Sequence, residues 1–335
     1  MNAQGLLSVG NTVSAARYAG VAKPGIVPAL LLLTYAGSVA APYSAKAPRG
    51  RAAVMGPLFA ATVYSTVSTE RLCLIISAAL TAAAFIARGI ATTGRPSLLN
   101  ARVAVVSLAL AGLLGAVFTG IAFVRVGRLD ATMRPVVENK LVVYAFGYLP
   151  AFGSWVQSDD ARPLGLGTAT VAGVDLLTGQ NRAATRAYHE FTEVGNKGQA
   201  TNIYTVFRGL ILDFGYPGTF AFLAAAGFAS GRIYRVVLLR PTMPKATALA
   251  AVYAWIFTSM TQSLFSFTNV SLAIILAGGL LSVRAKSSQL PKPKSASMSE
   301  LSSVETGDRL LGQGTVAPQD EGPSLHDERL DGVLS

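Results

Sequence analysis

Apolar residues along this chain gather into long runs separated by short polar connections. We read the runs at residues 24–42, 53–69, 72–88, 103–124, 206–231, 246–264 and 268–284. Each run is long enough, or nearly so, to cross about 30 Å of hydrocarbon as a helix. Only helices and closed barrels satisfy their backbone groups in lipid, so the pattern predicts an all-α polytopic integral membrane protein with about seven transmembrane helices.

The spacing of the runs also predicts how the chain is organised. Residues 1–125 hold four membrane helices, 126–205 form one large extracytoplasmic segment, and 206–285 hold three further helices. Residues 286–335 are rich in Ser, Pro, Gly and acids. Such a tail cannot bury enough apolar surface to offset its ordering entropy, and we expect it to be disordered and cytoplasmic.

Charge sets the orientation of these helices. The 335-residue chain is only 13% charged yet carries a net charge of +11. Its Lys and Arg residues fill the connections on one side of the alternating runs, with no acid among them, at 45–51, 88–102, 232–245 and 284–294. The positive-inside rule makes that side cytoplasmic. An odd number of spans then leaves the amino end outside without a secretory signal, which predicts an N-terminally shortened chain.

Metal and cofactor chemistry has little support in the sequence. His189–Glu193 reads HEFTE, which lacks the second histidine of the zinc helix H-E-x-x-H. Cys73, the single cysteine, lies within an apolar run and is interpreted as a packing residue. We therefore expect no metal, no cofactor and no nucleic-acid partner.

An aromatic stretch, LVVYAFGYLPAFGSWVQ at 141–157, stands out within the extracytoplasmic segment. Its glycines and proline are expected to break any long helix. The rings either anchor the stretch at the membrane interface or form platforms for sugar faces, and the residues alone leave both interpretations open. The glycines of 165–181 follow no strand, so a phosphate-binding loop is disfavoured and a flexible loop is expected.

Two opposite charges lie at the start of the apolar run after residue 201. Asn202 is expected to cap a helix there, and Arg208 and Asp213 are separated by about 140° around it, so each needs its own partner. Arg208 either reaches the outer interface or offers its planar fork to phosphate oxygens. The sequence FGYPG that follows Leu212 and Asp213 permits a kink. Nearly all acids of 1–285 lie between 130 and 213, where one of them can act as a base.

This stretch resembles the signature of bacterial oligosaccharide repeat-unit polymerases, the Wzy-type O-antigen and capsule polymerases. Their pattern of Asn-x-Tyr-Thr followed by Asp-Phe-Gly and a further Gly is matched here by Asn202, Tyr204, Thr205, Asp213, Phe214, Gly215 and Gly218. The segment YAFGYLPAFGSW is similar to the aromatic stretch that opens the family's large periplasmic region. The likeness extends from near residue 5 to about 285.

The resemblance implies a multi-pass glycosyltransferase of the bacterial cytoplasmic (inner) membrane. It would join undecaprenyl-pyrophosphate-linked oligosaccharides on the outer face, among membrane lipids, with a chain-length regulator and a flippase as partners. The candidate catalytic residues are Arg208, Asp213, Glu190 and Glu193. The candidate substrate-binding residues are Arg134, Tyr144, Trp155, Asn202, Tyr204 and Thr205. The alternatives are an O-antigen ligase-like glycosyltransferase and a transporter of lipid-linked glycans.

Overall fold

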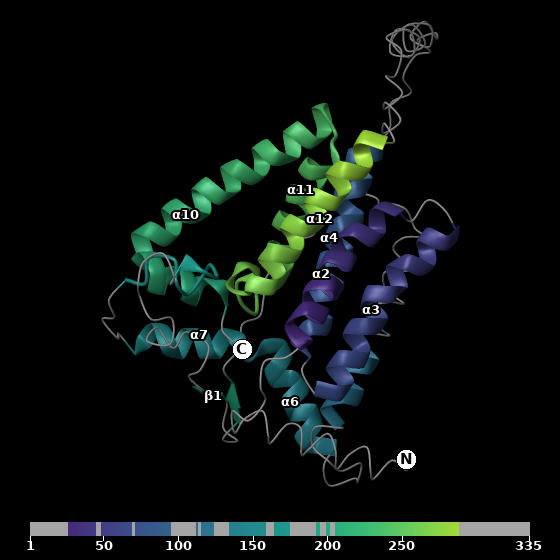
Figure 1. Ribbon diagram of the computed structural model, residues 1–335. Helices are drawn as coiled ribbons and strands as arrows, with labels where there is room; N and C mark the ends of the chain where they lie inside the picture. The colour runs from purple at the N-terminus through teal and green to yellow at the C-terminus, as the bar shows by residue number, and fades with distance from the viewer. Residues whose placement is uncertain are drawn as a thin grey trace, which may run out of the picture. The chain divides into compact units, whose positions relative to one another are not determined.

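A computed structural model describes residues 26–44, 48–68, 71–94, 112, 115–123, 134–158, 164–174, 192–194, 199–201 and 205–287 (Figure 1). These residues are mostly helical. Their main elements are α2 (Val27–Ser44), α3 (Pro48–Ser68), α4 (Leu72–Thr93), α6 (Arg134–Phe146), α7 (Tyr148–Gln157), β1 (Thr192–Val194), β2 (Gln199–Thr201), α10 (Val206–Leu239), α11 (Met243–Thr258) and α12 (Thr268–Ser287).

Wherever the structure describes the central part of a predicted apolar run, that part forms a helix. Among the described residues, three helices are long and apolar enough to cross a membrane: α2, α4 and α10. The apolar stretches of α3 and α12 are shorter, and α11 has 16 residues. The run at 103–124 and the tail beyond residue 287 lie wholly or mostly outside the described residues. The architecture is compatible with an all-α membrane protein, and the number of seven spans stays a prediction.

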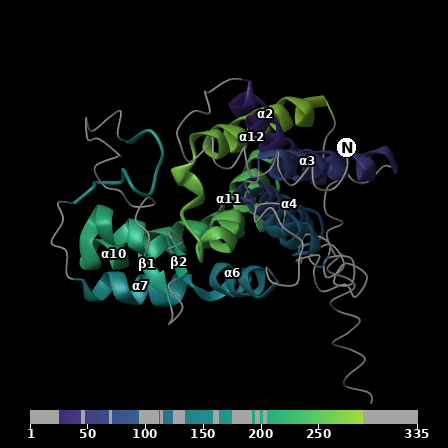
Figure 2. The same ribbon diagram turned by 90° about the horizontal axis from the view of Figure 1, so that it is seen from below.

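The bundle is built around α4, which packs against α2 and α11 (Figures 1 and 2). One face of α4 presents Leu80, Ala83, Ala84 and Ala87, each fully buried. Their spacing of three and four residues places them on one side of the helix. Small side chains on that face let neighbouring helices approach closely, as is common between membrane helices. A second close approach joins α2 to α3, where Gly37 lies against Pro57.

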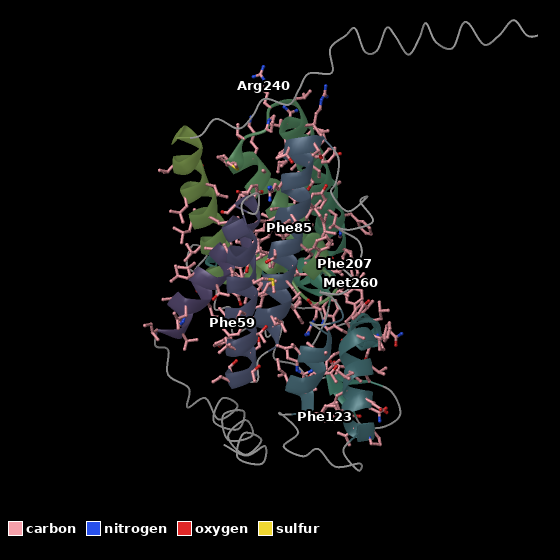
Figure 3. The ribbon with its side chains drawn as sticks, turned by 90° about the vertical axis from the view of Figure 1, so that its right-hand side faces the viewer. Phe59, Phe85, Phe123, Phe207, Arg240 and Met260 are labelled. Carbon is pink, nitrogen blue, oxygen red and sulfur yellow. The ribbon has the colours of Figure 1, made fainter. Side chains whose placement is uncertain are left out.

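Large apolar side chains cover the outside of the bundle. Phe59 of α3 is 70% exposed, and Phe220 and Phe228 of α10 are 73% and 69% exposed. Figure 3 shows Phe59 at the edge of the bundle. An apolar exterior of this extent is unusual in water and normal against hydrocarbon. It agrees with the membrane assignment drawn from the hydropathy pattern.

The end of the bundle where α4, α10 and α12 begin is called the outer end here, because the charge pattern predicts that it is extracytoplasmic. Arg240, on the predicted cytoplasmic side, lies at the opposite end from Phe207 and Met260 (Figure 3). In the sequence between α4 and α10, the described parts of 126–205 include α6, α7 and two short strands. The strands pair antiparallel, with Thr192 opposite Thr201. The two strands are a small departure from the all-α prediction.

The aromatic stretch forms two helices rather than one, with the break at Gly147. A Cβ atom at Gly147 would lie 2.4 Å from the carbonyl oxygen of Val143, so the change of direction requires glycine. The prediction that Pro150 and Gly153 also break the helix is wrong. Pro150 is the third residue of α7, where its missing N–H has no helical acceptor to lose.

The predicted kink in the helix that follows residue 205 is confirmed at Gly215, whose φ of 65° and ψ of 179° are non-helical. Such angles are open almost only to glycine. Pro217 follows and has no N–H to donate to Asp213, four residues earlier. The carbonyl oxygens of Leu212 and Asp213 instead accept hydrogen bonds from the N–H groups of Gly165 and Leu166, at 2.9 and 3.1 Å. The kink therefore opens α10 to the segment 164–174.

Candidate functional site

The Asp213 carboxylate is fully buried and held by the segment 164–174. It accepts hydrogen bonds from the backbone N–H of Ala169 at 3.0 Å and of Thr170 at 2.8 Å, and from the Thr170 hydroxyl. Gly165 comes so close that a Cβ atom there would lie 2.5 Å from Asp213 Oδ1. The expectation of a flexible loop from 165 onward is wrong for the described part, because a buried charge and two freed carbonyls fix it to α10.

The same segment is joined to the connection between α11 and α12. The Ser263 hydroxyl donates to the carbonyl of Thr170 at 2.8 Å, and the N–H of Ala172 donates to the carbonyl of Phe265 at 2.8 Å. The first N–H of α10, that of Val206, donates to the carbonyl of Ser259 at 2.8 Å. Three pieces of chain distant in sequence are thus tied together at the outer end.

Arg208 lies in the first turn of α10 and is only 1% exposed. Its guanidinium carbon is 5.4 Å from the centre of the Trp155 ring, within the range of a cation–π contact. Trp155 packs against Ala169 and Leu212 and stacks on Phe152, with ring centres 5.8 Å apart. A side chain this buried does not extend to the interface, so the structure favours a role within the protein over the interfacial interpretation.

Two donors near Arg208 are buried without an acceptor among the described residues. They are the indole Nε1–H of Trp155 and the hydroxyl of Thr205. Thr205 is the N-cap of α10 but makes no side-chain capping bond, so the prediction that Asn202 is the cap is wrong. Thr205 and Arg208 are three residues apart, which places them on one side of the first turn. A guanidinium, a hydroxyl and an indole N–H at a helix N-terminus form a cluster suited to an anion.

The other predicted residues either have different surroundings from this cluster or lie outside the described residues. Glu193 is exposed on β1. Tyr144 contacts Arg71 of the turn before α4. Arg134 begins α6, but its side chain lies outside what the structure describes, as do Glu190, Asn202 and Tyr204 entirely. Among the described residues, no group of three or more His, Cys, Asp or Glu side chains is arranged to hold a metal ion.

A cavity of about 310 Å³ lies elsewhere at the outer end. It is lined by the first turns of α4 and α12, by the residues leading into α12, and by two side chains of α2, Leu31 and Tyr35. None of its lining residues is a predicted site residue. The polar groups of the cluster around Arg208 are instead buried, so a ligand can reach them only if the surrounding structure opens.

The partners of Asp213 were missed by sequence reasoning. Ala169 and Thr170 are 44 and 43 residues away from it, and backbone donors leave no trace in composition. One signal was present: Pro217, four residues after Asp213, frees a carbonyl that must find another donor.

The chain matches no protein-family model, and no similar protein was found among curated proteins or solved structures.

Proposed function

We propose that this protein is a membrane glycosyltransferase that polymerises undecaprenyl-pyrophosphate-linked oligosaccharide repeat units on the outer face of the bacterial cytoplasmic membrane. One observation carries the proposal: a buried guanidinium, that of Arg208, lies on the Trp155 ring beside two buried donors without described acceptors. The cluster is at the outer end of apolar helices, where a lipid-linked pyrophosphate presents its charge. The resemblance of 201–220 to repeat-unit polymerases points the same way.

In this proposal the reaction transfers the growing glycan from its lipid carrier to a hydroxyl at the non-reducing end of an incoming unit. The glycosidic bond to the carrier breaks, and negative charge develops on the departing pyrophosphate. Arg208 stabilises that charge, with Thr205 and the Trp155 indole donating hydrogen bonds to phosphate oxygens. Arg134 is a candidate for a second cation, and Tyr144 for contact with the sugar.

The acceptor hydroxyl must lose its proton as the new bond forms. Glu193, exposed on β1, and Glu190 are the proposed bases. Asp213 receives a different role: its carboxylate is fully buried and accepts three hydrogen bonds, so it positions the segment that supports Trp155. Asn202 and Tyr204, just before α10, are proposed to contact the substrate. A chain-length regulator and a flippase are the expected partners.

The test uses the full chain in lipid nanodiscs with lipid-linked repeat units, and it measures polymer length by gel electrophoresis. Arg208→Ala is expected to lower the rate by about 100- to 1,000-fold, the usual cost of losing one transition-state donor. Arg208→Lys keeps a charge but not the planar fork, and should retain an intermediate rate. Arg235→Ala is the matched control, because Arg235 is exposed on the same helix.

Three outcomes separate the alternatives. Normal polymer from Arg208→Ala at equal protein levels would remove Arg208 from the site. Transfer of preformed polymer to a different acceptor, without chain growth, would identify a ligase. Movement of the lipid-linked glycan across the bilayer without a new glycosidic bond would identify a transporter.

A further inference from the structure

A second arginine at the outer end has an unusual environment. Arg71 is the N-cap residue of α4, in the turn after α3, and is 7% exposed. Its guanidinium carbon is 4.6 Å from the centre of the Phe118 ring and 4.4 Å from that of Tyr144. The two rings meet edge to face at 87°, with centres 5.9 Å apart. The two rings are nearly perpendicular, and the guanidinium lies between them. This arrangement is called the aromatic corner below.

The aromatic corner covers part of the guanidinium but does not satisfy all of its hydrogen-bond donors. The Nη1 atom of Arg71 is buried and has no hydrogen-bond partner among the described residues. The ring faces attract the cation, and the Tyr144 side chain also hydrogen-bonds to the guanidinium, but neither interaction supplies an acceptor for Nη1. A planar group held against rings keeps its N–H groups in fixed directions, and the buried Nη1 atom is left without an acceptor among the described residues. Oxygens of an anion would complete the site.

A buried cation has lost its hydration, so pairing with an anion stabilises it more at this position than at an exposed one. Burial lowers the pKa of the Arg71 guanidinium, while Tyr144 acts in the opposite direction. Arginine nonetheless stays protonated at neutral pH, so a buried positive charge remains. Among the described residues no carboxylate pairs with it. Asp213 is engaged by 164–174, and Glu138 and Glu193 are exposed on α6 and β1.

The position within the bundle indicates which anion is at hand. Arg71 stands where α4, a helix long and apolar enough to cross a membrane, begins. Phosphates of lipid headgroups occupy that level of a bilayer. The N-terminus of α4 adds partial positive charge from its unpaired backbone N–H groups. Arg71 and the helix end therefore favour the same kind of ligand.

We propose that Arg71, held between Phe118 and Tyr144, is a phosphate-binding site for a membrane lipid, separate from the Arg208 cluster. The ligand is a phosphate ester carried by a lipid of the outer leaflet. Two sources share this chemistry: an ordinary anionic phospholipid and an isoprenyl-linked phosphate. The proposal does not depend on the glycosyltransferase assignment, since it concerns binding alone.

The test is native mass spectrometry of the full chain released from detergent, titrated with phosphatidylglycerol, with undecaprenyl phosphate, and with diacylglycerol as the phosphate-free lipid. Phosphatidylglycerol or undecaprenyl phosphate is expected to bind at least tenfold more tightly than diacylglycerol. Arg71→Ala should remove that preference. Arg71→Lys, which preserves charge and fold, should weaken it by a smaller factor. Arg235→Ala, at an exposed position, should leave it unchanged.

The ring walls provide a second set of variants in case Arg71→Ala does not fold. Tyr144→Phe keeps the ring but removes a hydroxyl that hydrogen-bonds to Arg71, so it should keep most of the preference. Tyr144→Leu should weaken the preference further, because it also removes the ring that holds the cation. Binding of undecaprenyl phosphate alone would assign the site to an isoprenyl carrier, and binding of both would assign it to headgroup phosphate generally. Equal affinity for all three lipids, or a preference unaffected by Arg71→Lys and Tyr144→Leu in folded protein, would overturn the proposal.

Discussion

Replacing Asp213 by asparagine tests whether this carboxylate is a structural anchor or a catalytic base. The change keeps the shape of the side chain and one acceptor oxygen. It also turns an amide NH₂ toward donors that now bind a carboxylate oxygen, those of Ala169 or Thr170. An anchor should therefore lose its hold on the segment 164–174 even in the absence of any substrate.

The size of the effect follows from the contacts. At least one buried backbone N–H loses its acceptor, which costs about 1–3 kcal/mol, and the surviving bond is no longer assisted by charge. A total near 3 kcal/mol corresponds to roughly a 100-fold change in an opening equilibrium. The amides of Ala169 and Thr170 should show that loss of protection. Those of Gly165 and Leu166, which donate to backbone carbonyls, should lose less.

Hydrogen–deuterium exchange of the protein in nanodiscs measures these amides directly. Two threonines of the segment provide a matched pair. Thr170→Val removes a donor to Asp213 and should lower protection by about 1 kcal/mol, or roughly fivefold. Thr168→Val removes a buried hydroxyl that has no partner among the described residues, and should leave protection unchanged or raise it.

A double-mutant cycle of Asp213→Asn with Thr170→Val tests whether Asp213 anchors the segment 164–174 through Thr170. If the two side chains act through one contact, the combined loss of protection is smaller than the sum of the separate losses. If Asp213→Asn leaves exchange of Ala169 and Thr170 as in the unsubstituted protein while abolishing polymer formation, then Asp213 acts on the substrate and the anchoring role is wrong.

Two glycine predictions concern the bundle, and both are checked by thermal unfolding in detergent. Gly215→Ala should destabilise by about 1–2 kcal/mol because its φ of 65° disfavours any Cβ, whereas Gly227→Ala, in an open helical part of α10, should be neutral or stabilising. Gly37→Ala should cost about 1–3 kcal/mol, since its Cβ would lie 2.9 Å from Pro57 Cγ, while Gly56→Ala meets nothing within 4 Å and should be tolerated. Equal melting temperatures within either pair would contradict the reasoning.

The helices were predictable because burial in a membrane needs only a long apolar run, and that signal lies within one segment. The end of α10 was less predictable. The helix continues to Leu239, well past the predicted residue 231, because the charged residues Arg232 and Arg235 interrupt the apolar run without ending the helix. The kink was also predictable, since Gly215 and Pro217 act on their own backbone. In each case the cause and the effect are close in sequence.

The site was predictable only in part, because its contacts join distant segments. The aromatic stretch identified Tyr144 and Trp155 but not the cation that each ring contacts. Nothing near Arg71 in the sequence reveals that Phe118 and Tyr144 enclose it. Helical spacing correctly required separate partners for Arg208 and Asp213. It gave no means of naming them.

The anchoring of Asp213 changes where the proposed base should be sought. To accept a proton from a sugar hydroxyl, this carboxylate would have to give up hydrogen bonds to Ala169 and Thr170 and expose a surface that is now fully buried. Each such bond to a charged group contributes about 1.5–3 kcal/mol, and that cost would be added to the reaction barrier. Glu193 carries no such penalty, because β1 leaves it exposed while its backbone pairs with Ala200. The physical argument therefore favours an exposed acid of the segment 126–205 as the proposed base, with Asp213 keeping Trp155 in place against Arg208.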